Sequence, residues 1–409
     1  VSSSSGLEKR PKLRFPGFDE PWQTTLLSSV FAKNTQKNAD GRITNVICNS
    51  AKQGLIPQRE YFDKDIANSD NTNGYYIIEE NDFVYNPRKS ADAPYGPISS
   101  YKYTEAGIVS PLYLCFRAKK EINPAFFEWY FQSPAWHRYV YMSGDSGARH
   151  DRVSIKDDIF FAMPICLPSA HEQERIASFL ERVDQRIEKQ RALVDALKKY
   201  KRGLLSREFG QQENGDLNNR HVGKLKDYFH LSSGSTPSST NRAFYSGNIR
   251  WVSSGELKPK YLCETSQHIS SEAVSSCNLR EYPANTLLIA MYGLEAAGVR
   301  GTASILSVPA TISQACMAIQ QTGEIDIEYL YYWYIYNGQW IGIRIAQGTK
   351  QQNLSTDTLG SLRIYAPSYS KQKKVCKLLS QIDYLIEKES QKFDLISSVK
   401  RGLLQQIFI

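Results

Sequence analysis

The sequence lacks the short motifs that mark most catalytic and cofactor-binding sites. It has no GxxxxGK[ST] loop for nucleotide phosphates, no GxGxxG turn after a strand and no GxSxG turn around a nucleophilic serine. The Asn-Pro pairs at Asn86 and Asn123 are not followed by the Pro-aromatic pair expected of an amino-methyltransferase site. A fused methyltransferase or nuclease would need such motifs, so we expect a chain that catalyses nothing by itself.

Metal-ligand patterns and long apolar runs are also missing. The six histidines form no HExxH and no close pair, and the seven cysteines form no CxxC. We therefore expect no metal site, and scattered reduced thiols indicate a cytoplasmic protein. No apolar run approaches the roughly 18 residues of a membrane span. Residues 1–21, which begin VSSSSGLEKRPK, have no apolar core of a signal peptide, and we expect a flexible N-terminal lead.

The size and charge of the chain limit its class only loosely. A length of 409 residues suits two to four domains. The 50 Lys and Arg residues exceed the 42 Asp and Glu residues by eight, which is compatible with a nucleic-acid partner but is weak evidence for one.

The most informative feature that is present is a duplicated stretch of 42 residues. The stretch from Pro168 to Phe209 recurs 199 residues later, from Pro367 to Phe408, without a gap. Agreement over this length indicates an internal duplication rather than chance. The positions of the first copy that recur unchanged are Pro168, Ser169, Gln173, Leu180, Asp184, Ile187, Glu188, Lys189, Asp195, Lys201, Arg202, Gly203, Leu204, Leu205 and Phe209.

Each copy has the pattern of a long coiled-coil helix, because its apolar positions alternate in steps of four and three. So narrow an apolar stripe needs a partner, and we expect the two helices to pair rather than to be unrelated surface helices. Gln190 and Glu389 interrupt the stripes at equivalent positions near the helix midpoints. Parallel packing would place Lys201 against Lys400. We therefore predict an antiparallel pair in which Gln190 faces Glu389 and fixes the register.

The segments before the helices are related too, so the chain contains two similar globular domains. LSSVF from Leu27 matches LKDYF from Leu225, and the offsets drift along the domains as loops diverge. Short apolar runs predict strands, which makes the fold class α/β (α+β) in tandem duplication. The strands are expected at 75–78, 83–85, 112–116, 249–252, 287–292 and 315–319. The expected order is domain 22–167, helix 168–209, linker 210–221, domain 222–366 and helix 367–409.

Two other stretches allow alternative interpretations. The aromatic residues of 124–142 and 329–340 could stack on bases, but their spacing near three and four favours a helix that faces the core. The run Gly234-Ser-Thr-Pro-Ser could hold a phosphate, but a turn that enters a strand is favoured.

This organisation resembles the specificity subunit of type I restriction-modification systems. The resemblance depends on P-S-x-x-x-Q at Pro168 and Pro367, on L-x-x-x-D-x-x-I-E-K at Leu180 and Leu379, and on KRGLL at the end of each helix. The second domain adds the run from Gly234 to Ser238 and the run Ile249-Arg-Trp-Val. These motifs are weak individually, but they occur in duplicate and in order over essentially the whole chain.

The resemblance implies that each globular domain recognises one half of a split site in double-stranded DNA. The helices would form an antiparallel coiled coil that sets the spacing and docks methyltransferase subunits, two of them. Those partners would hold S-adenosylmethionine, and a separate ATP-driven restriction and translocase subunit would cut the DNA. This chain would hold no cofactor. The alternative is a coiled-coil interaction scaffold that binds protein or sugar and shows no salt-dependent affinity for DNA.

Two pairs of loops supply the candidate DNA contacts. One pair follows the strands that end at Tyr85 and Met291, and its contents differ between the domains, as two different half-sites would require. The other pair spans 147–152 and 348–353 and keeps a basic residue for phosphates, with amides that suit adenine edges. Any one of these residues could instead be a solvated charge or part of a polar turn. The candidates are Arg88, Lys89, Tyr95, Arg149, Arg152, Tyr292, Arg300, Lys350, Gln351 and Asn353.

Overall fold

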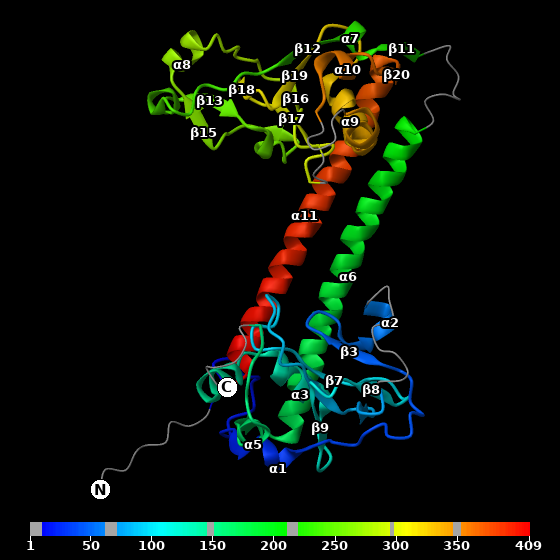
Figure 1. The fold of residues 1–409 in the computed structure, drawn as a ribbon, viewed down its shortest axis with the longest axis vertical. Coiled ribbons are helices and arrows are strands. Elements are labelled where there is room, and N and C mark those ends of the chain that lie inside the picture. Colours follow the sequence, from blue (N-terminus) through cyan, green and yellow to red (C-terminus); the bar gives the residue numbers. More distant parts are fainter. Residues whose placement is uncertain (1–9, 62–71, 145–150, 211–219, 295–297, 347–352) are drawn as a thin grey trace. The chain divides into compact units, whose positions relative to one another are not determined.

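The computed structural model describes residues 10–61, 72–144, 151–210, 220–294, 298–346 and 353–409 (Figure 1). The chain divides into two compact units, residues 1–191 with 391–409 and residues 192–390. The long helices α6 (Ala170–Phe209) and α11 (Tyr369–Ile407) contribute residues to both units. Each unit therefore contains one globular domain, part of α6 and part of α11.

A four-stranded antiparallel sheet in the order β2-β9-β6-β7 forms the centre of the first domain. These strands are β2 (Phe31–Lys33), β9 (Leu114–Ala118), β6 (Phe83–Tyr85) and β7 (Ile98–Ser100). Three two-stranded pairs accompany the sheet: β1 (Gln23–Leu26) with β10 (Pro164–Leu167), β3 (Ile47–Ser50) with β4 (Gly54–Pro57), and β5 (Tyr76–Ile78) with β8 (Gly107–Val109). The short helices are α1 (Leu27–Val30), α2 (Gln58–Tyr61) and α5 (Asp157–Phe161).

The aromatic segment of the first domain is a core element, as its spacing predicts. The predicted continuous helix over 124–142 is wrong, however, because the segment forms α3 (Pro124–Gln132) and α4 (His137–Ser143). The break lies at Ser133 and Pro134, since proline disfavours helical geometry in the residue before it. The large aromatic side chains on both sides of the break are buried, namely Phe126, Phe127, Trp129, Tyr130, Phe131 and Trp136.

The second domain contains a five-stranded mixed sheet in the order β12-β19-β16-β17-β14. These strands are β12 (Phe229–Ser233), β19 (Cys316–Gln321), β16 (Leu287–Ala290), β17 (Ala303–Leu306) and β14 (Tyr261–Leu262). A smaller sheet joins β15 (Gln267–Ile269), β13 (Ile249–Val252) and β18 (Thr311–Ile312), and β11 (Arg220–Lys224) pairs with β20 (Arg363–Pro367). Short helical elements are α7 (Leu225–Tyr228), η3 (Arg242–Tyr245), η4 (Ser254–Glu256), α8 (Ser271–Ser276) and α10 (Thr356–Gly360).

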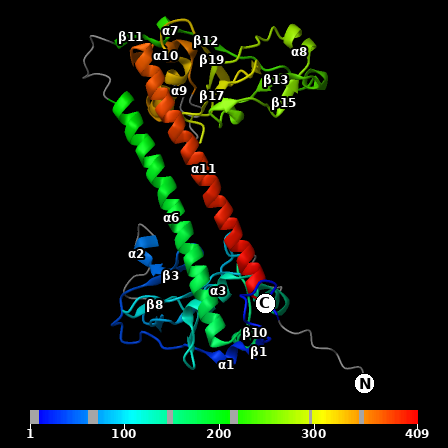
Figure 2. The ribbon, with the colours of Figure 1, turned by 180° about the vertical axis from the view of Figure 1, so that it is seen from behind.

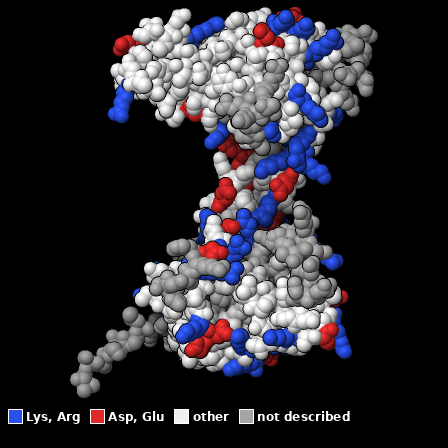
Figure 3. Space-filling model, in the orientation of Figure 1, with Lys and Arg blue, Asp and Glu red and all other residues white. Residues whose placement is uncertain are grey.

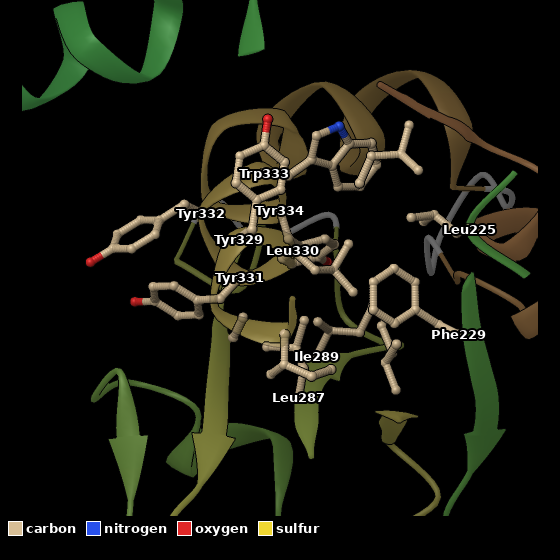
Figure 4. Packing of buried hydrophobic residues seen from close by; sticks show 14 of the residues in the cluster. Leu225, Phe229, Leu287, Ile289, Tyr329, Leu330, Tyr331, Tyr332, Trp333 and Tyr334 are labelled. Atoms are coloured by element: carbon tan, nitrogen blue, oxygen red, sulfur yellow. The ribbon is translucent and has the colours of Figure 1, made fainter. Parts of the chain in front are cut away.

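The aromatic helix α9 (Ile327–Trp340) lies inside the second domain and continues into a π-helical turn, η5 (Ile341–Ile345). All six residues from Tyr329 to Tyr334 are buried, and they share one core with Leu287 and Ile289 of β16 and Phe229 of β12 (Figure 4). A helix that is apolar on every side is stable only when it is enclosed. The core interpretation of this segment is therefore confirmed.

The two domains repeat the same central arrangement. The order β2-β9-β6 in the first corresponds to β12-β19-β16 in the second, and the pair β1 with β10 corresponds to β11 with β20. Each of the six predicted strands corresponds to an observed strand that begins and ends within two residues of the predicted bounds. The prediction of duplicated α/β domains is thus confirmed by the architecture of each unit.

The P-S-x-x-x-Q motif has the same structural role at the start of both long helices. The Gln173 side-chain amide donates to the Pro168 carbonyl at 3.0 Å, and Gln372 donates to the Pro367 carbonyl at 2.8 Å. The Gln372 side-chain oxygen also accepts the Asp326 backbone N–H at 2.8 Å. These bonds satisfy polar groups at the junction between the last strand of each domain and its helix.

Packing inside each unit shows that the helices are antiparallel. In the first unit, Leu404 and Phe408 share a core with Ile176 and Leu180 from the start of α6. Figure 1 and Figure 2 both show the end of α11 beside this part of α6. In the second unit, Leu205 and Phe209 at the end of α6 share a core with Cys376 and Leu379 at the start of α11.

The described part of the N-terminal segment contacts the first unit. Arg14 makes two hydrogen bonds of 2.8 Å to Glu172, whose side chain is 1% exposed. Phe15 packs edge-on against Phe179 with ring centroids 5.4 Å apart. The Leu13 N–H donates to the Gln406 carbonyl at 3.0 Å. These residues therefore lie against both long helices. Within the described residues, no helix carries an apolar stretch long enough to cross a bilayer.

Candidate nucleic-acid interface

The two loops that the sequence singles out in the first domain are hydrogen-bonded neighbours. The Lys89 N–H donates to the Asp151 carbonyl at 2.8 Å, and the Val153 N–H donates to the Pro87 carbonyl at 2.8 Å. Arg88 and Arg152 form an isolated antiparallel bridge between these contacts. Segments 64 residues apart thus place three cationic residues in adjacent positions at the end of β6.

The shape of the first loop depends on two local features. The Asn86 side-chain oxygen accepts the Arg88 N–H at 3.1 Å, and its amide donates to the Asn49 carbonyl at 3.1 Å. Gly96 has a φ of +84°, and a Cβ atom there would lie 2.2 Å from the Asn86 carbonyl oxygen. The loop therefore requires glycine at this position. Asn86 and Asn49 are not among the site residues that the sequence predicts, although the Asn-Pro pair is itself a turn signal.

Arg152 lies between two hollows in the surface of the first domain. One hollow has a volume of about 410 Å³ and is lined by Arg88, Lys89 and Arg152 together with Asn49 and other polar residues. The other has a volume of about 490 Å³ and is lined by Arg152 together with Tyr76, Tyr85, Lys33 and other residues. Arg88 and Lys89 are exposed, and Arg152 is half-buried. Its Nε atom is buried and has no partner among the described residues.

These cations can serve two kinds of contact. Phosphate oxygens accept from any exposed guanidinium or ammonium group, and a planar guanidinium also matches the acceptor edge of guanine. A buried donor without a partner is costly, so a ligand acceptor at Arg152 would remove that cost.

Tyr95 is held against the body of the first domain. Its ring is 4.7 Å from the ring of His137, and its backbone carbonyl accepts the Tyr85 hydroxyl at 2.8 Å. Burial lowers the pKa of His137, so the imidazole facing Tyr95 favours its neutral form. Tyr95 therefore stabilises the far end of the loop that carries Arg88 and Lys89.

The second domain brings the equivalent segments together. The Leu354 N–H donates to the Met291 carbonyl at 2.9 Å, which matches the bond between Val153 and Pro87. Tyr292 is 41% exposed, and the adjacent Asn353 is also exposed. A tyrosine and an amide thus occupy the place that cationic side chains occupy in the first domain.

Arg300 is more enclosed than its loop position suggests. Its Nε donates to the Leu294 carbonyl at 2.5 Å, and its aliphatic part lies where a Cβ at Gly342 would approach Cγ to 2.8 Å. These contacts give it a role in shaping the loop after β16. Three further candidates, Arg149, Lys350 and Gln351, lie outside the described residues.

One group of potential metal ligands occurs within the described residues, at Asp326, Glu328 and Cys376. Asp326 forms an ion pair with Lys373 at 2.5 Å, and Glu328 forms one with Lys260. Burial raises the pKa of the Cys376 thiol well above its ordinary value, so the thiolate that a metal requires is disfavoured. The donor set therefore suits an internal ion-pair network rather than a metal ion.

Charges of both signs occur along the helices on the face shown in Figure 3, and much of each domain's surface there is uncharged. On this face, an attraction for DNA would consequently depend on the loops.

A family model for the type I restriction modification DNA specificity domain matches the chain twice, over residues 21–197 and 219–397. Each match covers one globular domain and most of the long helix that follows it. The two matches together include most of the chain.

Two curated relatives share a lower level of similarity with part of the chain. The MjaIX specificity subunit of a type I restriction enzyme from Methanocaldococcus jannaschii is 28% identical over 192 residues, which cover 46% of this chain and 43% of that protein. The EcoR124I/EcoR124II specificity subunit from Escherichia coli is 26% identical over 174 residues, which cover 42% of each. The aligned regions thus span less than half of these relatives.

Solved structures share the fold over nearly the whole chain. The HsdS subunit from Thermoanaerobacter tengcongensis has 16% identity and a TM-score of 0.52, with 98% of this chain and 99% of that chain covered. A type I restriction-modification S subunit from M. genitalium has 15% identity and a TM-score of 0.57 at the same coverage. A chain from a study of assembly and conformational transition in a type I R-M system has 16% identity and a TM-score of 0.64, with 96% and 98% covered.

Proposed function

The chain belongs to the family of type I restriction-modification DNA specificity proteins, and on this basis we propose that it is the DNA-recognising, non-catalytic subunit of a methyltransferase complex. The observation that carries the proposal is the presence of two family domains whose equivalent loops have different contents. Each domain would recognise one half of a bipartite site in double-stranded DNA.

The loop contents support two different half-sites. At the end of β6 the first domain offers Arg88, Lys89 and Arg152, whereas at the end of β16 the second offers Tyr292 and Asn353. Arginine and lysine bond phosphates and guanine, while asparagine matches the donor and acceptor pair of adenine. Equivalent backbone positions would thus present different recognition chemistry.

The partners we propose are methyltransferase subunits, docked on the helices, and a restriction and translocase subunit. Equivalent positions on the helices expose apolar side chains, with Tyr200 56% and Val399 50% exposed. A duplicated surface suits two copies of one methyltransferase subunit. S-adenosylmethionine and ATP would be bound by those partners. We place the complex in the cytoplasm, in keeping with seven unpaired cysteines.

We infer that Gln190 and Glu389 do not meet directly, which corrects the register expected from the repeat. Gln190 is 5% exposed and Glu389 is half-buried, so both have the burial of seam positions. In the first unit, Lys400 pairs with Asp184 and Arg191 lies over the Phe393 ring; the residue numbers of each pair sum to 584, and the same register brings Gln190 to the level of residue 394. In the second unit, Lys201 pairs with Asp383 at the same sum, and this register brings Glu389 to the level of residue 195. Cysteines at 190 and 394 should therefore crosslink under mild oxidation more readily than cysteines at 190 and 389, and the reverse result would contradict this register.

Mapping methylated adenines in cells that carry this chain and its methyltransferase partner tests the main proposal. We expect methylation at one bipartite sequence, and none when either protein is expressed alone. The alternative scaffold function predicts no methylated motif and no salt-dependent affinity for DNA. Methyl transfer by the purified chain alone would also contradict the proposal.

A further inference from the structure

The lysine of each KRGLL segment lies where three structural elements meet. In the first unit, Lys400 of α11 forms an ion pair with Asp184 of α6. Its Nζ also lies 4.6 Å from the ring centroid of Trp129, which belongs to α3. One ammonium group therefore joins both long helices to the aromatic helix of the first domain.

The second unit contains the equivalent arrangement. Lys201 of α6 forms an ion pair with Asp383 of α11, and its Nζ lies 5.6 Å from the ring centroid of Tyr332 in α9. The Tyr332 hydroxyl donates to the Asp383 carboxylate at 2.8 Å. Lys201, Asp383 and Tyr332 thus each contact the other two.

The two arrangements, which we call the lysine clamps, are related by the internal duplication. Lys201 and Asp184 are each followed by their counterparts, Lys400 and Asp383, at the same offset of 199 residues. The duplicated motifs therefore exchange partners, since the lysine of each helix pairs with the aspartate of the other. The lysine side chains are only 19% and 18% exposed, so the apolar seam of the helix pair includes a charge at each clamp.

A charge in the seam restricts register in a way that apolar residues do not. An apolar heptad pattern matches itself again after a slip of seven residues, so apolar packing alone permits alternative registers. Such a slip of seven residues moves each residue by about 10 Å along the helix axis, which separates lysine from aspartate. Each charge would then be left partly buried without its partner, and this is strongly unfavourable.

The contact with the aromatic ring means that a change of register would also displace the lysine from its recognition domain. A cation over the face of tryptophan or tyrosine is attracted to the ring. Because Trp129 and Tyr332 belong to the core helices of their domains, a displaced lysine would lose its contact with the domain as well as with the other helix.

We propose that Lys201 and Lys400 are positioning residues that hold each recognition domain in one register on the helices and thereby determine the spacing between the two half-sites. The role in spacing rests on the proposed DNA-recognition function. The pairings rest on the geometry of each unit by itself.

The clamps differ in how many bonds support them. Tyr332 belongs to a wider network, in which its hydroxyl lies 3.1 Å from Ser380 Oγ, and Ser380 donates to Glu328 at 2.7 Å. Trp129 stands at the equivalent place in the first clamp and has no hydroxyl to donate to Asp184. The first clamp therefore depends more on its lysine, and removal of Lys400 should have the larger effect.

The test uses the full chain with its methyltransferase subunits and a plasmid library. The library carries the mapped half-sites separated by the natural spacer or by spacers one or two base pairs longer or shorter. We expect the wild-type complex to methylate one spacer length almost exclusively. Lys400→Gln and Lys201→Gln should increase the share of methylated sites with neighbouring spacers several-fold, with the larger increase for Lys400→Gln.

Matched controls separate spacing from general attraction to DNA. Arg202→Gln and Arg401→Gln remove the same charge from exposed neighbours in the same helices and should leave the spacer profile unchanged. The conservative variants Lys201→Arg and Lys400→Arg should keep the wild-type profile. Melting temperatures of all variants show whether each is folded.

Exchanging the charges of a lysine and an aspartate tests which aspartate is the partner of Lys201. Lys201→Asp should relax the spacer profile, and Lys201→Asp with Asp383→Lys should restore both the profile and the melting temperature. Lys201→Asp with Asp184→Lys should not, because Asp184 belongs to the other clamp. If folded lysine variants keep the wild-type spacer profile, or if both exchanges restore it equally, the role of the lysines is overturned. These outcomes leave the proposed DNA-recognition function unaffected. A wild-type complex that methylates no bipartite site would contradict the proposed function and, with it, the spacing role.

Discussion

Single side chains in this protein differ in whether their charge is available to a ligand. Arg117 is fully committed, because it bonds both oxygens of Asp82, at 2.6 and 2.7 Å, and that carboxylate is 1% exposed. Arg300 is likewise held by the Leu294 carbonyl. Arg88 and Lys89 are exposed at the end of β6 instead, next to the half-buried Arg152. A bond to a carboxylate or carbonyl of the protein thus distinguishes the structural cations from the candidate DNA contacts.

Replacing Lys89 with alanine should weaken binding to every DNA sequence by a similar factor, because a lysine ammonium contacts phosphates as a point charge, whereas replacing Arg88 should also relax the base preference of its half-site. Each lost phosphate contact should reduce the slope of log K against log salt concentration by about 0.9. Fluorescence anisotropy of the assembled complex over a series of salt concentrations measures the slope. Arg42→Ala removes an arginine that is 85% exposed elsewhere in the domain and serves as the control. An altered half-site preference with an unchanged slope after Lys89→Ala would show instead that Lys89 contacts bases.

His137 should make the stability of the first domain depend on pH. Burial places its folded pKa below the unfolded value of about 6.5, so the unfolded chain binds more protons between these two values. Stability from the neutral imidazole is therefore present above about pH 6.5 and is lost as the pH falls through the folded pKa. His137→Gln should flatten this part of the pH profile of denaturant unfolding. An unchanged acid-side slope would contradict the assignment.

At the scale of elements, the ends of the long helices complete the cores of the domains. Phe408, directly after α11, is 4% exposed, and its ring centroid lies 5.6 Å from that of Phe126 and 6.0 Å from that of Tyr130. Its counterpart Phe209 lies 5.1 Å from Tyr329 in the second domain. The first domain therefore depends on residues at the end of α11, almost 300 positions after its aromatic helix.

Phe408→Ala should lower the stability of the first domain by about 3–5 kcal/mol, and Phe209→Ala should do the same to the second. The cause is the loss of buried apolar area together with the cavity left in a close-packed core. Hydrogen exchange analysed by peptide in mild denaturant can assign each loss to its domain. Tyr200→Ala, at an exposed position of α6, should change stability by less than about 0.5 kcal/mol. Equal destabilisation of both domains by Phe408→Ala would contradict this division.

At the scale of the whole molecule, the duplication implies that recognition is modular. Each unit contains its own core, its own pair of adjoining loops and its own lysine clamp. Among the described residues, the loop contact of the first domain joins residues of that domain. The two half-sites should accordingly be recognised independently.

Replacing residues 22–167 with the equivalent domain of a relative should change one half of the methylated motif and leave the other half unchanged. The boundaries leave the helix from Pro168 onward intact, so the register and the docking surface are retained. Methylome sequencing of cells that express the chimaera with the methyltransferase subunit gives both halves at once. A simultaneous change in both halves would contradict independent recognition.

The sequence alone determined the repeat, the order of domains and helices, and the positions of most central strands. Local periodicity was sufficient for these features, because heptad spacing and short apolar runs are properties of neighbouring residues. It also placed α6 and α11 within about two residues of their observed ends. It failed at Pro134, where the aromatic spacing continues across a residue that interrupts the helix.

Only the tertiary structure decided which distant residues meet. The contact of Lys89 with Asp151, the enclosure of Arg300 and the pairing of Lys201 with Asp383 all join positions that no local pattern connects. The heptad spacing placed Lys201 and Lys400 in the seam, but it could not supply their partners. Those partners depend on how two helices almost 200 residues apart align, and that alignment is set by packing of whole cores rather than by any single stretch of sequence.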